Sequence, residues 1–346
     1  MSTKFRVLIV LLALFIAVVV TACISPAPPA SAVPPTPALT TVRVGYAPLV
    51  SNGPLFIAID EGYFARQGIN VELVKIQNGP DMIPPLVNGD IAAGGTGVSA
   101  ALINAVSKGG RVRIVADKGR TAPNQSCNTS GIMVRQDLYT RGEVTKASDL
   151  KGKKIGVPSA LDYKTSRVLK MGNLTSDDVE IISMDFASSV VALRNGAVDA
   201  ADLTEPYVTQ LKDDNVAVML IPTEESCPDY PTPFYYGTAF LDKDPELGKR
   251  FMVAYLEGVR QYNLGKTERN LAILSNYTPL DRDLLQRSCW VPVARNGDVP
   301  RQPLKDYMDW MYANKKIAQI PGEDQIFDMS FIDYANGVLQ NTTSSG

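Results

Sequence analysis

The sequence predicts an α/β protein made of two similar lobes, and two observations lead to this prediction. Short apolar runs of strand type alternate along the chain with helical patterns, which is typical of parallel sheets covered by helices on both faces. In addition, the pattern Leu-x-Asn-Gly-x-aliphatic occurs twice, as "LVNGDI" at 86–91 and "LRNGAV" at 193–198. Asn-Gly accommodates the left-handed turn that ends a helix, so each copy predicts a helix stop leading into a short strand.

The first lobe is predicted to begin near residue 41. Val42, Val44 and Tyr46 alternate with Arg43 and Gly45, which indicates a strand. The segment "PLFIAIDEGYFARQ" at 54–67 predicts a helix with proline in its first turn and a glycine directly after it as a stop. Further strands are predicted at 69–76, 91–97 and 111–117, and further helices at 81–87 and 99–107.

The second lobe repeats this order of elements. Strands are predicted at 153–160 and 179–185, and helices at 163–171 and 188–194, before the second Asn-Gly stop. The tail from 245 onward has helical apolar spacing and is predicted to pack back on the first lobe.

Two strand-like segments, 130–139 and 234–244, fit no strand–helix–strand unit. We expect them to be the two strands of a hinge between the lobes. The predicted first lobe is then 41–129 plus 241–346, and the predicted second lobe, with the hinge strands, is 130–240.

The amino-terminal 40 residues predict export and anchoring. Lys4 and Arg6 precede the apolar run 7–20, which is typical of a secretory signal peptide and somewhat short for a spanning helix, although an uncleaved signal anchor is the alternative. "VTAC" resembles the bacterial lipobox, which implies a signal peptide at 1–22 and a lipid-modified Cys23 as the first mature residue. The proline-rich remainder of 23–40 predicts an extended tether. We therefore expect a folded part held at the outer face of the cell membrane by the lipid anchor alone.

Composition excludes several function classes. The 346 residues include no histidine, so bases and metal ligands of that type are ruled out. A net charge of −2 gives no reason to expect nucleic acid as a partner. The cysteine spacing fits no zinc pattern, and we expect neither a metal nor a cofactor.

Four stretches in this order resemble one family: "PLFIAIDEGYFARQGINVELV", "LVNGDIAAGG", "DLKGKKIGVP" and "ALRNGAVDAADLTEPY". They are similar to the periplasmic solute-binding proteins of ABC importers, in the branch for nitrate, sulfonate, taurine and thiamine precursors. The resemblance implies a type II periplasmic-binding-protein fold, in which two mostly parallel sheets flanked by helices close on one small molecule. It also implies a monomer that passes its ligand to a membrane permease and catalyses nothing. The rivals are an enzyme and a ligand sensor for a membrane receptor; relatives that make the thiamine pyrimidine consume a histidine, which this chain lacks.

Ligand contacts are expected from loops that follow strands, because ligands bind beyond the carboxyl ends of parallel strands. In the first lobe the candidates are Tyr46, Asn52, Asn78, Thr96 and Ser99. In the second lobe they are Ser159, Tyr163, Asp185 and Glu205, with Tyr235 on the hinge. The alternative for each acidic residue is that it caps a helix or lies on a solvated rim. The backbone amides of the loop 94–97 could meet a polar ligand group, or its glycines could only permit a tight turn.

These loops predict a flat heteroaromatic ligand. They carry Lys164, with Lys118 and Arg120 further off, but no dense basic cluster, and they are richer in Tyr, Asn, Ser and acidic residues. Among the ligands of the family and of related lipoproteins, riboflavin is therefore the first choice. Thiamine pyrimidine precursors follow, and then sulfonate, taurine or nitrate.

An extracytoplasmic compartment permits disulfides. Cys127 and Cys227 each lie just before a proposed hinge strand, so we hypothesise that they pair. Cys289 is then unpaired and buried beside Trp290.

Overall fold

The computed structural model describes residues 38–76, 79–122, 127–158, 162–278 and 280–344. Residues Leu39–Gly346 form one compact unit. The predicted signal peptide, Cys23 and most of the tether lie outside the described residues, as do Asn78 and Ser159. Within the described ranges, no helix is both long enough and apolar enough to cross a bilayer.

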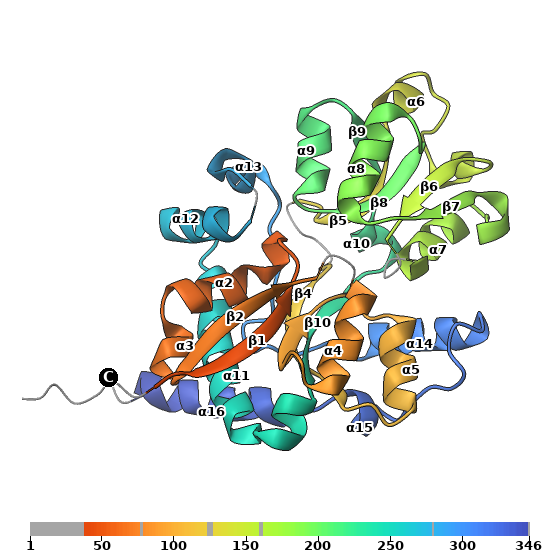
Figure 1. The fold of residues 1–346 in the computed structure, drawn as a ribbon. Coiled ribbons are helices and arrows are strands. Elements are labelled where there is room, and N and C mark those ends of the chain that lie inside the picture. Colours follow the sequence, from red (N-terminus) through yellow and green to blue (C-terminus); the bar gives the residue numbers. More distant parts are fainter. Residues whose placement is uncertain (1–37, 77–78, 123–126, 159–161, 279, 345–346) are drawn as a thin grey trace, which may run out of the picture. The chain divides into compact units, whose positions relative to one another are not determined.

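The first lobe is built on a five-stranded sheet in the order β2-β1-β3-β10-β4 (Figure 1). β1 is parallel to β2 and β3, whereas β10 runs antiparallel to both of its neighbours. The strands are β1 (Thr40–Tyr46), β2 (Ile69–Lys75), β3 (Ala93–Gly95), β4 (Val112–Arg120) and β10 (Pro231–Gly237).

Helices cover both faces of this sheet (Figure 1). One face packs on α2 (Gly53–Asp60), α3 (Tyr63–Arg66), α11 (Pro245–Tyr262), α12 (Glu268–Tyr277), α13 (Arg282–Arg287) and α16 (Ser330–Ser344). The other packs on α4 (Ile83–Asn88), α5 (Ala100–Ser107), α14 (Gln302–Ala313) and α15 (Glu323–Ile326). The single helix expected at 54–67 is two helices, because the chain turns at Gly62 with φ 69°.

The second lobe has a matching sheet in the order β7-β6-β8-β5-β9, in which β5 is the antiparallel strand. Its strands are β5 (Ser130–Arg135), β6 (Lys154–Val157), β7 (Glu180–Ser183), β8 (Ala200–Thr204) and β9 (Ala217–Pro222). Its helices are α6 (Gln136–Thr140), α7 (Asp162–Met171), α8 (Phe186–Asn195), α9 (Tyr207–Asp213) and α10 (Thr223–Ser226). Both Asn-Gly sites end helices as expected, with Gly89 at φ 82° and Gly196 at φ 76°.

The expected hinge strands need correction. β5 and β10 are not crossings but interior strands of the second and first sheets. Phe234, Tyr235 and Tyr236 are fully buried, and their side chains alternate between the two faces of the first sheet, so this run belongs to that sheet. The chain crosses between the lobes just before these strands, and the described residues of the two crossings are 121–122 with 127–129, and 227–230. Thr121 joins them: its N–H donates to Tyr230 O (3.1 Å), and its Oγ1 donates to Cys227 O (2.7 Å).

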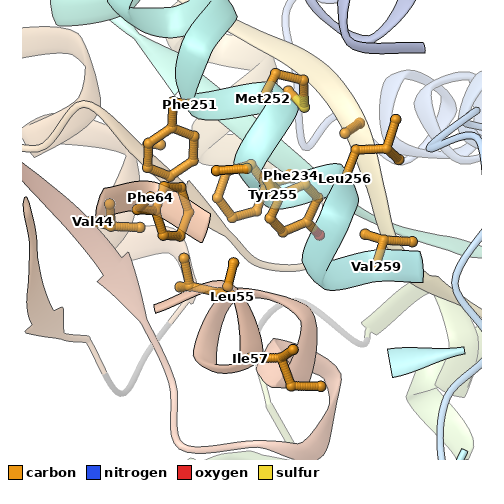
Figure 2. Close-up of a cluster of buried hydrophobic side chains, with 14 of the residues drawn as sticks. Val44, Leu55, Ile57, Phe64, Phe234, Phe251, Met252, Tyr255, Leu256 and Val259 are labelled. Carbon is orange, nitrogen blue, oxygen red and sulfur yellow. The ribbon is translucent and has the colours of Figure 1, made fainter. Parts of the chain in front are cut away.

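The largest apolar cluster lies where α11 packs on the sheet and α2 (Figure 2). Phe251 is fully buried, and its ring centroid lies 4.5 Å from that of Phe64 and 5.3 Å from that of Phe240. Phe234 stacks on Tyr255 at 4.6 Å. This packing confirms that the helical tail returns to the first lobe.

The crossing of α2 and α11 depends on a glycine. A Cβ at Gly258 would lie 2.2 Å from Pro54 O and 2.9 Å from Ala58 Cβ, so the two helices would have to separate. We expect Gly258→Ala to lower the free energy of unfolding by about 3 kcal/mol. In the control Gly337→Ala, on α16, the new Cβ meets nothing within 4 Å, and the better helix propensity of alanine should raise stability by about 1 kcal/mol. Urea denaturation of both variants measures the difference; a stable Gly258→Ala protein would contradict the close crossing.

A segment after α13, which we call the C-terminal strap (residues 288–297), connects the two lobes. Its Cys289 N–H donates to Glu205 of the second lobe (2.9 Å). Towards the first lobe, Ala294 N–H donates to Asp117 Oδ2 (2.7 Å), and Pro292 O accepts from Arg120 N–H (3.0 Å). The strap thus runs beside β4 and reaches the second lobe.

The strap explains why the expected disulfide is wrong. Cys127 is bonded to Cys289, with Cα atoms 5.9 Å apart, and Cys227 is a buried free cysteine. Cys227 faces the apolar cluster around Tyr163 and Tyr230, whereas the strap carries Cys289 to the first crossing. The sequence positions of Cys127 and Cys227 correctly predict that both lie near the crossings. They do not determine the directions of the side chains, which do not meet.

Candidate functional site

A cavity of about 350 Å³ lies between the facing edges of the two sheets. Its walls come from the carboxyl ends of the parallel strands and from the amino ends of β5 and β10, as expected for open α/β sheets. The polar lining residues are Ser51, Asn52, Lys75, Thr96, Lys118, Arg120, Thr121, Thr129, Ser130, Lys164, Asp185, Thr204, Tyr207, Tyr230 and Thr232.

A second hollow, of about 610 Å³, lies on the second lobe near α6 and α8. It is lined by Arg135, Arg141 and Arg194, but each of these guanidinium groups is paired with a carboxylate. Because this charge is already neutralised within the protein, we place the candidate site in the interlobe cavity.

The interlobe cavity is electropositive. Four cationic side chains line it, against the single carboxylate of Asp185 among the described lining residues. Within the described part of the chain, none of the four forms an ion pair, whereas many surface lysines and arginines do. The four are Lys75, Lys118, Arg120 and Lys164.

The expectation that the site has no dense basic cluster is wrong, because four cationic side chains line the cavity. β4 continues to Arg120, three residues beyond the predicted strand end at 117, and so carries Lys118 and Arg120 to the edge of the sheet. The sequence contains both residues, but a strand that ends at residue 117 leaves them further from the expected ligand contacts.

Lys118 is the most enclosed of the four cations, with 2% of its surface exposed. Its Nζ donates to Ser51 Oγ (2.8 Å), and burial lowers the pKa of the amine to about 7, against the opposing charge of Asp117. Gly95, at the end of β3, leaves room for the stem of Lys118, since a Cβ there would lie 2.2 Å from Lys118 Cδ.

Lys164 approaches the cavity from the second lobe. It is 7% exposed, and its Nζ lies 5.1 Å from the ring centroid of Tyr230, a cation–π geometry. Beneath it lies Asp202, whose pKa burial raises to about 6 while the charge of Lys164 and a hydrogen bond from Thr165 oppose the rise. Lys164 therefore has attractive neighbours but no close counter-ion among the described residues.

The second lobe also contributes an aromatic wall. Phe186 and Tyr207 stack with centroids 6.0 Å apart and planes at 21°, and both line the cavity. Burial raises the pKa of the Tyr207 hydroxyl. A flat or apolar part of a ligand fits this wall.

Three of the predicted contacts line the cavity: Asn52, Thr96 and Asp185. Asn52 is buried, and its Nδ2 donates to Ala47 O (2.6 Å). Asp185 also caps α8, because its Oδ1 accepts from Ser188 N–H (2.7 Å). Asn78 and Ser159 fall outside the described residues.

The other five predicted contacts do not line the cavity. Tyr46 packs edge-on against Phe56, and Ser99 caps α5. Tyr163 stacks on Tyr307 of α14 (4.8 Å). Glu205 accepts from Thr209 and from the strap, as described above. Tyr235 is wholly buried in the first sheet.

Comparison with known proteins places the chain in a family. Residues 51–263 match the model of the "NMT1/THI5 like" family. The riboflavin-binding protein RibY of Chloroflexus aurantiacus is 24% identical over 74% of this chain and 74% of its own length. A Brucella abortus protein that is named only as a binding protein is 27% identical over 74% of this chain and 76% of its own length.

Solved structures share the fold. The nitrate-binding protein NrtA of Synechocystis has a TM-score of 0.69 at 18% identity, covering 88% of this chain and 90% of that one. The alkanesulfonate-binding protein SsuA of Xanthomonas axonopodis, bound to MOPS, has a TM-score of 0.66 at 20% identity, covering 83% and 98%. The desulfurization enzyme DszB has a TM-score of 0.62 at 14% identity, covering 86% and 99%, so the fold alone does not exclude catalysis. The family model spans more than half of the chain, which therefore belongs to the NMT1/THI5-like family.

Proposed function

We propose that this protein is the solute-binding component of an ABC importer and that it captures a small organic anion in the interlobe cavity. The observation that carries the ligand class is the set of four cavity cations without an ion-pair partner in the described residues. The ligand is then passed to a membrane permease. Relatives named as binding proteins for riboflavin and bicarbonate support the transport role.

The cations of the cavity wall require a compensating negative charge. Removing cations from water is unfavourable unless a negative charge or several hydrogen bonds replace the lost hydration. Lys118 and Lys164 are nearly enclosed, and Asp185 is the one carboxylate among the described lining residues. A carboxylate, sulfonate or phosphate bound between the lobes supplies the missing charge and accepts hydrogen bonds from both sides.

Riboflavin is the second candidate, favoured by the stacked pair of Phe186 and Tyr207 at the cavity wall. Its ring carbonyls accept hydrogen bonds from lysine, although the molecule is neutral. A thiamine pyrimidine precursor fits the same wall with less contact area. Organic sulfonates belong to the proposed class of small organic anions. Taurine carries the same sulfonate group beside an ammonium, and nitrate is an inorganic anion.

The two ligand candidates are separated by matched pairs of compounds. Riboflavin and its 5′-phosphate share one ring and differ by a phosphate, and benzenesulfonamide is a neutral counterpart of benzenesulfonate. We expect the anionic member of each pair to bind at least about tenfold more tightly by calorimetry, at one molecule per chain, with affinity falling as salt rises. Tighter binding of riboflavin than of its phosphate would favour the second candidate, and recovery of a chemically altered ligand would favour an enzyme.

Lys164→Met tests the cavity directly, and Lys170→Met is its control on the same helix. Lys164 lines the cavity and Lys170 is exposed to solvent. Loss of a charged hydrogen-bond partner should weaken anion binding by about 10- to 100-fold in the first variant and leave the second unchanged. If the two variants bound the anion with equal affinity, the interlobe cavity would not be the binding site.

The cellular setting is also part of the proposal. Lipid attachment at Cys23, export to the outer face of the membrane, a permease partner and a monomeric state are predictions that rest on the sequence pattern and the family.

A further inference from the structure

Building on the proposed function, we propose that Lys118 determines specificity for the anionic group and that its amine takes up a proton as the anion enters the cavity. This assigns the charge-binding position to the first lobe, at the end of β4 between Ser51 and Gly95. The class of ligand group is an oxyanion that accepts a hydrogen bond from an ammonium.

The Lys118 side chain lies in an enclosed position at the wall of the cavity. Lys118 lines the cavity although only 2% of its surface is exposed, so protein encloses nearly all of the residue. Its hydrogen-bond partner is the hydroxyl of Ser51, on the short helix Val50–Asn52. A hydroxyl accepts the bond but supplies no negative charge. The glycine opposite leaves the space that the stem occupies.

Among the described residues, the Lys118 amine has no ion-pair partner. The adjacent Asp117 is fully buried, and both of its carboxylate oxygens accept backbone N–H groups, from Gly119 (2.9 Å) and Ala294 (2.7 Å). It attracts Lys118 through space but forms no ion pair with it. The other titratable or charged groups of the described cavity lining are Lys75 of β2, Arg120 of β4, Lys164 of α7, Asp185 before α8, Tyr207 of α9 and Tyr230 of the second crossing.

This lining gives three further cations and one carboxylate, and that carboxylate caps α8. Burial disfavours an ammonium at Lys118, and the attraction of Asp117 offsets this only in part, so the pKa of the amine is lowered to about 7. An anion that enters the cavity reverses the local charge and stabilises the ammonium. The pKa of Lys118 is therefore higher in the complex than in the free protein.

A pH dependence follows with a definite sign. Below about pH 7 the amine is charged before and after binding, so affinity is independent of this group. Between the pKa of the free protein and the higher pKa of the complex, binding takes up one proton, and the dissociation constant rises by up to about tenfold for each pH unit. Affinity for the anion thus falls as pH rises above neutrality.

The proton can be followed without knowing the natural ligand. The full chain is labelled with ¹³Cε-lysine, and the Lys118 signal is identified by its loss in Lys118→Met. The pH titration is then recorded with and without two probes, inorganic sulfate and benzenesulfonate. We expect a midpoint near pH 7 without anion and an upward shift of about one pH unit or more with a bound probe. A midpoint near that of a free lysine, or one that neither probe moves, would overturn the inference.

Failure of this inference can be distinguished from failure of the proposed function. If no anion of the panel raises the melting temperature or binds by calorimetry, the proposed function fails. If anions bind while the Lys118 titration stays unmoved, only the assignment of Lys118 fails.

Lys118→Arg distinguishes proton uptake by Lys118 from a purely structural role of this side chain. A guanidinium stays charged throughout this pH range, so the variant should bind benzenesulfonate with a dissociation constant that no longer changes between pH 7 and 9. Lys118→Met should lose about 10- to 100-fold in affinity together with the pH dependence. An unchanged pH slope in Lys118→Arg would show that another group takes up the proton.

Discussion

Replacing Cys127 and Cys289 together with serine should lower the free energy of unfolding by about 5 kcal/mol under oxidising conditions. The disulfide joins residues separated by 162 positions, and in the chain-entropy model a loop of that size restricts the unfolded chain by about this amount. Urea unfolding of the oxidised parent and of the double variant measures the difference. Reduced parent protein should unfold at the same urea concentration as the variant; if the two oxidised proteins had equal midpoints, the bond would not form in solution.

A free-thiol count establishes the pairing separately. On denatured, unreduced protein, Cys227→Ser should lower the count by one, because Cys227 is free in the structure. Cys127→Ser should raise it by one, because it releases Cys289. A rise in the Cys227→Ser protein would instead mean that Cys227 is paired.

Phe251→Ala should cost about 4 kcal/mol of unfolding free energy. The ring is fully buried among Phe64, Phe234 and Phe240, so its removal leaves a cavity that the surrounding helix and sheet cannot fill. Phe251→Leu retains much of the volume and should lose less than half as much. Denaturant unfolding of the two variants gives the ratio; equal losses would show that the lost side-chain volume does not determine the cost.

The features of the fold that the sequence predicts well are local. The turns at Gly89 and Gly196 depend on adjacent residues only, and both end helices as expected. Strand neighbours depend on segments distant in sequence. β10 was therefore placed on the hinge, although it pairs with β3 and β4, more than 100 positions earlier in the chain.

The site shows the same division. Thr96 and Asp185 lie one and two residues after the ends of β3 and β7, and both line the cavity. Lys118 and Arg120 lie within the last residues of a strand, and no local pattern indicates that β4 extends to them. Glu205 has the residue type and position of a ligand contact, but the strap, which has no repeating pattern, occupies its carboxylate.

The interior position of β10 also affects the order in which the two sheets can be completed. A ribosome must synthesise the whole of the second lobe before the strand that separates β3 from β4 exists. The five strands of the second sheet, in contrast, come from one uninterrupted stretch that ends at Pro222. During synthesis from the amino terminus, the later lobe can therefore complete its sheet first. The earlier lobe waits for Gly237, and the covalent link between Cys127 and the strap waits for Cys289.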